Sequence, residues 1–85
     1  MREEKHMDKL IVFGYRLKKL RLQHGWSQQE LADRLGCSKG LISFYENAKR
    51  EAGFTVIIEL ARIFDVRPGY LAGEESVPML KKIAN

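Results

Sequence analysis

The residues of this chain that could take part in chemistry are few, and their spacing indicates binding rather than catalysis. His6, His24 and Cys37 do not show the spacing of a metal site. The sequence also contains no glycine-rich phosphate loop and no nucleophile motif. We therefore expect no metal, no cofactor and no enzymatic activity. Basic, hydroxyl and amide side chains instead gather between positions 38 and 50, in the stretch SKGLISFYENAKR, where they could contact another molecule.

Two short helices joined by a tight turn are predicted to position that stretch. Ser27 and Glu30 can form a capping box, because the hydroxyl can accept an early backbone N–H and the carboxylate can reach back three residues. Gly36 should end the first helix, since glycine adopts the left-handed conformation without a steric penalty. Ser38 is then the expected N-cap of the second helix.

The second of these helices has an unusual outer face. Ile42 and Tyr45 share one side and should turn inward. Lys39, Ser43 and Phe44 then point outward. An exposed aromatic side chain beside a lysine is unusual for a plain globular domain, and it indicates that this face contacts another molecule.

Length and composition limit the classes of protein to consider. The 85 residues are enough for one small domain, and a hydrophobic content of 45% is enough for one core. The excess of 15 Lys and Arg over 11 Asp and Glu gives a net charge of +4, which is compatible with phosphate binding without establishing it. A single cysteine excludes an internal disulfide and favours a cytoplasmic protein. No apolar run is long enough to span a bilayer, and no signal-peptide pattern is present.

The chain is predicted to contain one folded domain between two terminal segments. Residues 1–8 are expected to form a flexible N-terminal extension, and residues 9–73 the domain itself. Residues 74–85 form a C-terminal tail that is expected to be helical or to take part in a dimer. Asp8 is the expected N-cap of a first helix that ends near Gln23.

Helical periodicity predicts which side chains of the flanking helices form the core. In the first helix, Phe13, Leu17 and Leu20 should be buried and Arg16 should face solvent. A later helix places its apolar stripe at Phe54, Ile57, Leu60, Ala61 and Phe64. Pro68 suits the first turn of a short final helix, where its missing N–H has no cost, and Gly73 should follow its end.

The stretch around the two short helices resembles the helix-turn-helix of the Cro/CI, or xenobiotic-response-element type, regulators. The resemblance is carried by Gln28, Leu31, Ala32, Leu35, Gly36, Ser38, Ile42, Tyr45 and Glu46 and by the string ISFYENAKR, and it extends from about Phe13 to about Leu71. It implies an all-α, five-helix, lambda-repressor-like DNA-binding domain in which helices 2 and 3 form the helix-turn-helix. The sequence departs from the family at Ala48, usually glycine, and at residues 51–53, which often include proline.

The resemblance also implies roles for individual residues. Those expected to read base edges are Lys39, Gly40, Ser43 and Phe44. Those expected to contact phosphates are Gln28, Ser38, Asn47, Lys49 and Arg50. Arg21 and Glu46 match positions that form an ion pair in the family, between the first helix and the end of the third. Trp26 matches an apolar position and should seal the edge of the core rather than stack on a base.

The expected partner is double-stranded DNA. A single small domain reads few base pairs, so we expect a homodimer that acts as a repressor on a near-palindromic operator. The candidate residues for the dimer surface are Tyr70, Val77, Met79, Leu80 and Ile83. Such a protein would be bacterial or phage-encoded, cytoplasmic, and associated with the nucleoid when bound.

Other functions of the same fold stay open at this point. The chain could be an antitoxin or a mobile-element immunity repressor, with a toxin or effector as an additional partner. It could also be a protein–protein adaptor that uses Phe44, Ile58 and Ile63 as contact residues.

Overall fold

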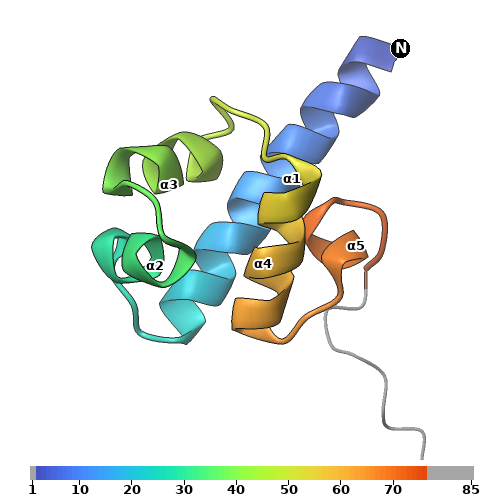
Figure 1. Cartoon of the computed structure of the whole chain (residues 1–85). Coiled ribbons are helices and arrows are strands. Elements are labelled where there is room, and N and C mark those ends of the chain that lie inside the picture. Colours follow the sequence, from blue (N-terminus) through green and yellow to red (C-terminus); the bar gives the residue numbers. More distant parts are fainter. Residues whose placement is uncertain (1, 77–85) are drawn as a thin grey trace, which may run out of the picture.

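One side chain from each of five helices meets at the centre of the molecule. These fully buried residues are Leu17, Leu31, Ile42, Leu60 and Leu71. The computed structural model describes the backbone of residues 2–76 and the side chains of residues 9–76 (Figure 1). Over this range the helices are α1 (Arg2–Gln23), α2 (Gln28–Leu35), α3 (Lys39–Glu46), α4 (Phe54–Phe64) and α5 (Pro68–Leu71). The prediction of an all-α domain with five helices is therefore confirmed for the described residues.

The first helix is longer than predicted. It begins at Arg2, so Asp8 lies inside the helix and is not its N-cap, and the backbone of residues 2–8 is helical. The sequence is consistent with this, because no glycine or proline interrupts residues 2–8. In Figure 1 the N-terminal turns of α1 project beyond the other helices.

Helices α1 and α3 approach each other closely at Gly14. A Cβ atom at this position would lie 2.6 Å from the carbonyl oxygen of Tyr45 and 2.7 Å from that of Glu46. The contact is extended by Phe13, whose ring packs edge-to-face on that of Tyr45 with centroids 5.6 Å apart. Gly14 therefore allows the C-terminal end of α3 to rest directly on the backbone of α1.

Two predictions about side-chain placement were wrong. Phe54 was expected on the buried stripe of α4, but it is 80% exposed because it is the first residue of that helix and lies beyond the part that packs on the core. Arg16 was expected on the solvent side. Its Nη1 atom instead donates to the carbonyl oxygens of Tyr70, at 2.6 Å, and Glu75, at 2.7 Å. The guanidinium also lies 4.1 Å from the centroid of the Tyr70 ring, so Arg16 joins α1 to α5.

Of the residues predicted for the dimer surface, only Tyr70 lies in the described part of the chain, and the packing of α5 buries it. Pro68 starts this helix as expected, and Tyr70 is only 8% exposed, so its ring belongs to the core of one subunit rather than to an open surface. Val77, Met79, Leu80 and Ile83 lie outside the described residues. Within the described part of the chain, no helix has the length and apolar character needed to cross a membrane.

Candidate nucleic-acid interface

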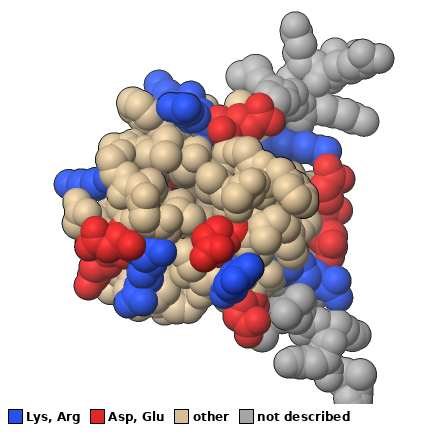
Figure 2. All heavy atoms as spheres, in the orientation of Figure 1, with Lys and Arg blue, Asp and Glu red and all other residues tan. Residues whose placement is uncertain are grey.

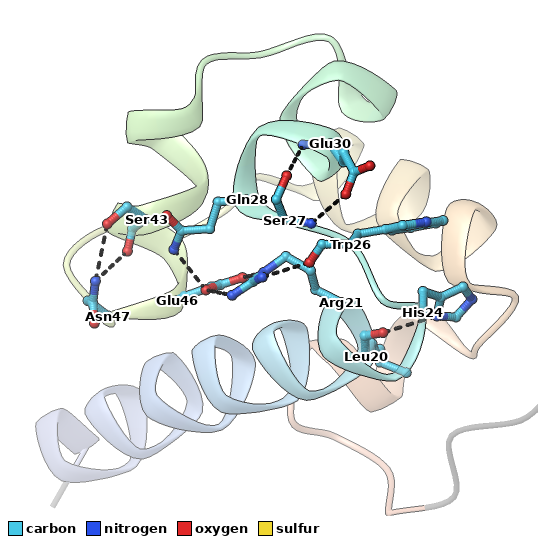
Figure 3. A network of polar contacts seen from close by, with 10 residues as sticks. All are labelled: Leu20, Arg21, His24, Trp26, Ser27, Gln28, Glu30, Ser43, Glu46 and Asn47. Carbon is cyan, nitrogen blue, oxygen red and sulfur yellow. Dashed lines mark hydrogen bonds and ion pairs between the residues drawn. The ribbon is translucent and has the colours of Figure 1, made fainter.

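The turn between α2 and α3 is built from the local signals that the sequence contains. Glu30 donates its backbone N–H to Ser27 Oγ at 3.0 Å, and its carboxylate accepts the Ser27 N–H at 2.7 Å, which completes the capping box (Figure 3). Gly36 ends α2 with φ of 82°, in the left-handed region. Ser38 then caps α3, because its hydroxyl accepts the N–H of Leu41 at 3.1 Å. These predictions are confirmed.

Helix α3 buries one face and exposes the other. Ile42 and Tyr45 are buried, as predicted. Lys39 and Gly40 are exposed, and the Phe44 side chain is 52% exposed although it is large and apolar. Ser43 differs from expectation in being only partly exposed. The outer face of α3 therefore consists of Lys39, Gly40 and Phe44, with Ser43 at its edge.

Asn47 is directed back onto α3 rather than outward. Its Nδ2 atom donates to the carbonyl oxygen of Ser43 at 2.9 Å and to the Ser43 hydroxyl at 3.2 Å (Figure 3). The amide donor of Asn47 is therefore bonded to Ser43 in this structure, although the residue itself is exposed. Its expected contact with a phosphate stays a prediction. The Ser43 hydroxyl, which accepts the bond from Asn47, still has its own hydrogen to donate.

An ion pair links α1 to the end of α3. Arg21 donates from Nε to Glu46 Oε2 at 2.6 Å and from Nη2 to Glu46 Oε1 at 3.0 Å. The two side chains are only 8% and 2% exposed, so the pair lies almost entirely inside the fold. The hydrogen bond with the carboxylate raises the pKa of the Arg21 guanidinium above its ordinary value, against the opposing effect of burial. The ion pair that the family resemblance implied is thus present.

The same carboxylate also holds the start of α2. Gln28 donates from Nε2 to Glu46 Oε1 at 3.0 Å, and Arg21 donates from Nη1 to the carbonyl oxygen of Trp26 at 2.8 Å. Figure 3 shows these residues converging on Glu46 between the three helices. The Gln28 side chain was expected to contact a phosphate. One hydrogen of its Nε2 group is used in the bond to Glu46 and the second is left to donate, so the phosphate contact stays a prediction. The first backbone N–H groups of α2 have no carbonyl partner within the helix and stay suited to an anion.

Trp26 lies at the edge of the core, as expected. It is partly buried, and its ring centroid lies 5.5 Å from that of Phe64 and 4.6 Å from that of His24. The guanidinium of Arg34 lies 4.0 Å from the same ring. Cys37 also packs against the core, and burial raises the pKa of its thiol, which favours the unreactive protonated form.

The loop after α3 takes a path that the sequence had not predicted. Ala48 adopts φ of 57°, in the left-handed region where the family usually has glycine. The N–H of Lys49 is bonded to the Phe44 carbonyl oxygen at 2.8 Å, and that of Ala48 to the Tyr45 carbonyl oxygen at 3.2 Å. This is the Schellman pattern of a helix C-terminus, with alanine in the glycine position. The loop places Lys49 and Arg50 at the surface, both exposed, directly after α3.

Charge alone does not mark this surface. Figure 2 shows basic and acidic side chains interspersed around a broad uncharged area in the view of Figure 1. The candidate interface is identified instead by geometry, because α3 and the loop that follows it present exposed Lys39, Phe44, Lys49 and Arg50. Among the described residues, no three His, Cys, Asp or Glu side chains come together as a metal site would require.

One residue that positions this surface was not predicted. Gly14 sets the distance between α1 and α3, but it has no polar group and lies outside the helix-turn-helix. Its signal in the sequence is an isolated glycine inside a helical pattern, which is unfavourable by about 1 kcal/mol relative to alanine and therefore calls for a packing reason.

Comparison with known proteins agrees with this geometry. Residues 17–71 match the model of the helix-turn-helix family HTH_3. The chain is 37% identical over 65 residues to the uncharacterized HTH-type transcriptional regulator YqaE of Bacillus subtilis, a match that covers 76% of this chain and 56% of that protein. It is 31% identical over 67 residues to the HTH-type transcriptional regulator ImmR of the same organism, covering 79% and 53%. The chain thus spans just over half the length of these two relatives.

Two solved structures have the same fold. The restriction-modification controller protein C.AhdI from Aeromonas hydrophila has a TM-score of 0.70 and 33% identity, over 78% of this chain and 96% of that one. The hypothetical transcription factor NHTF from Neisseria has a TM-score of 0.72 and 27% identity, over 79% of this chain and 77% of that one.

Proposed function

The chain belongs to the helix-turn-helix family HTH_3, and we propose on this premise that it is a sequence-specific regulator of transcription that binds double-stranded DNA. The observation that carries the proposal is the exposed outer face of α3, formed by Lys39, Gly40 and Phe44. A helix of this size fits the major groove of B-form DNA, with the residues of its N-terminal end at the base edges.

Each side chain of this face suits a particular contact. Lys39 can donate to guanine O6 or N7, and Phe44 can pack against a thymine methyl group. Ser43 can donate its hydroxyl hydrogen to a base or a phosphate. Gly40 has no side chain, and a Cβ atom there would have only Ser38 Oγ within 4 Å, at 3.9 Å, so the helix can approach the bases closely.

Phosphate contacts would hold α3 in the groove. Lys49 and Arg50 are exposed on the loop after α3 and suit the phosphates at one side. The free N–H groups at the start of α2 and the exposed Ser38 suit the phosphates at the other side of the groove. Because Glu46 bonds to both Arg21 and Gln28, the start of α2 and the end of α3 have a set separation before DNA binds.

We further propose that two copies bind together and act as a repressor. One domain buries a small area on DNA, and useful specificity usually needs a second copy. A two-fold dimer would place its α3 helices about 34 Å apart, on successive turns of a near-palindromic operator. Occupancy of such a site in the cytoplasm would block access by RNA polymerase.

Selection from random duplexes, followed by sequencing, tests both sequence-specific binding and binding by two copies. We expect an enriched motif with two inverted half-sites about one helical turn apart. Binding to the selected duplex, measured by fluorescence anisotropy, should weaken steeply as salt rises because counterions are released. Failure to enrich any motif would contradict sequence-specific binding. A single half-site bound by one copy would contradict the dimer, and an affinity independent of salt would favour a protein–protein adaptor.

A further inference from the structure

The side of α1 that faces away from the core carries an apolar surface that DNA binding by α3 does not explain. Five large hydrophobic side chains are exposed among the described residues, and three of them lie on α1. These are Ile11, Tyr15 and Leu22, which are 55%, 65% and 57% exposed. We call these three residues, with the exposed Lys18 and Lys19 between them, the outer α1 face.

The spacing of this face is that of a helix-packing seam. Positions 11, 15, 18 and 22 are separated by four, three and four residues, which is the a/d pattern of a heptad repeat. The seam extends for about 16 Å, or three helical turns. Isolated exposed hydrophobic residues are common, but three in one register on one helix form an apolar strip, interrupted only at Lys18, that another helix could cover.

The charges beside the strip are unbalanced. From Lys9 to Gln23, α1 contains no Asp or Glu. The other basic residues in this range are engaged: Lys9 with Glu74, Arg16 with carbonyl oxygens at α5, and Arg21 with Glu46. Neither Lys18 nor Lys19 has an ion-pair or hydrogen-bond partner among the described residues. Between residues 9 and 23, the apolar strip is therefore flanked by positive charge that no acidic residue of this part of α1 compensates.

We propose that the outer α1 face binds an acidic amphipathic helix of a partner protein. Apolar residues of that helix would cover Ile11, Tyr15 and Leu22, while Glu or Asp residues beside them would pair with Lys18 and Lys19. Two occupants from this chain fit less well. A second copy would bring its own lysines to the same seam, and residues 77–85 carry Lys81 and Lys82 next to their apolar residues. The short seam indicates a transient partner rather than a permanent subunit.

Two synthetic peptides test the proposal with the full chain. Both contain three heptads with Leu at a and d, and they differ only in carrying Glu or Lys at e and g. In fluorescence anisotropy at about physiological salt, we expect the Glu peptide to bind at least tenfold more tightly than the Lys peptide. The double substitution Lys18→Glu/Lys19→Glu should reverse this preference.

Variants of the apolar strip locate the binding site. Tyr15→Ser/Leu22→Ser should weaken binding of the Glu peptide at least tenfold, and Phe54→Ser, which removes an exposed aromatic on another helix, should leave it unchanged. Arg62→Glu is the charge control, since it reverses one positive charge at an exposed position of α4 and should not reverse the preference between the peptides. Circular dichroism and thermal unfolding of each variant distinguish lost binding from lost folding.

Four results would overturn the proposal. The first is equal binding of the two peptides, or binding of neither. The second is a Tyr15→Ser/Leu22→Ser variant that retains full binding of the Glu peptide. The third is weaker self-association of that variant in sedimentation equilibrium, which would identify a second copy as the occupant. The fourth is a tenfold gain in peptide affinity for Met79→Ser/Leu80→Ser, which would show that residues 77–85 occupy the face in the free protein.

Discussion

At its C-terminal end α3 is held by its neighbours, whereas at its N-terminal end it presents Lys39 and Gly40 to solvent. Tyr45 and Glu46 rest on Gly14, Glu46 is bonded to Arg21 and Gln28, and the following loop closes a Schellman cap. Lys39 and Gly40, two turns earlier, are exposed. The comparison shows how a short helix can present a free surface in a defined direction. Rigid packing at the C-terminal end fixes the direction in which the N-terminal end of α3 points. DNA binding would therefore require little reordering of α3.

The largest expected effect comes from removing the Glu46 carboxylate, which holds the C-terminal end of α3. Glu46→Ala leaves the buried Arg21 guanidinium without its partner, which should lower the free energy of unfolding by about 3–5 kcal/mol. Urea denaturation measures the change. The control is Arg21→Met/Glu46→Leu, which removes both charges and should recover most of the loss. Equal destabilisation by the single and double changes would show that packing, not the unpaired charge, dominates.

Adding one methyl group at the contact between α1 and α3 should also be costly. Gly14→Ala places a Cβ within 2.7 Å of two carbonyl oxygens of α3, so the helices must separate. We expect the free energy of unfolding to fall by about 1–3 kcal/mol. DNA binding should also weaken, because the end of α3 shifts. Gly40→Ala is the matched control, since its Cβ meets open space; it should not destabilise the fold. A Gly14→Ala protein as stable as the parent would contradict the close contact.

On the proposed DNA-binding surface, Lys39→Ala and Arg50→Ala should act differently. Loss of Lys39 should cost about 1–3 kcal/mol on the preferred duplex and relax base preference at one position. Loss of Arg50 should weaken binding to all duplexes alike and reduce the slope of log K against log salt by about one unit. Anisotropy titrations over several duplexes and salt concentrations measure both. If both variants bind like the parent, the placement of α3 in the groove is wrong.

The smallest expected effect concerns Ala48, in the Schellman cap that follows the C-terminal end of α3. Ala48 adopts a left-handed conformation that costs a non-glycine residue about 1–2 kcal/mol. Glycine would avoid this cost, but it would also lose more conformational entropy on folding than alanine does, which offsets part of the benefit. Ala48→Gly should therefore stabilise the protein by about 0.5–1 kcal/mol. Thermal unfolding should show this as a rise in Tm of several degrees. Ala72→Gly, at a helical φ of −76°, should instead destabilise.

The local features of the candidate interface were predictable from the sequence. Ser27, Glu30, Gly36 and Ser38 act within a few residues of themselves, so their roles follow from spacing alone. The inward direction of Ile42 and Tyr45 follows from the helical period. The Arg21–Glu46 pair was expected from the family resemblance, because 25 residues separate its members and no local rule joins them.

Other features depend on which groups meet across the fold. Gln28 donates to Glu46, a residue of another helix, because this acceptor lies within reach, although the family resemblance indicated only a contact with phosphate. Arg16 is partly buried because the Tyr70 carbonyl oxygen of α5 lies within its reach, and Phe54 is exposed because it precedes the part of α4 that packs on the core. None of these outcomes could be read from the periodicity of a single helix.

By itself, the sequence determined where α2 and α3 begin and end and which face of α3 is hidden, because capping and periodicity act over a few residues. Only the tertiary structure decided how close α3 lies to α1 at Gly14, and that Arg21 and Gln28 share the carboxylate of Glu46. These outcomes depend on packing and hydrogen bonds between segments far apart in the chain. Their energies exceed the local preferences of the residues involved.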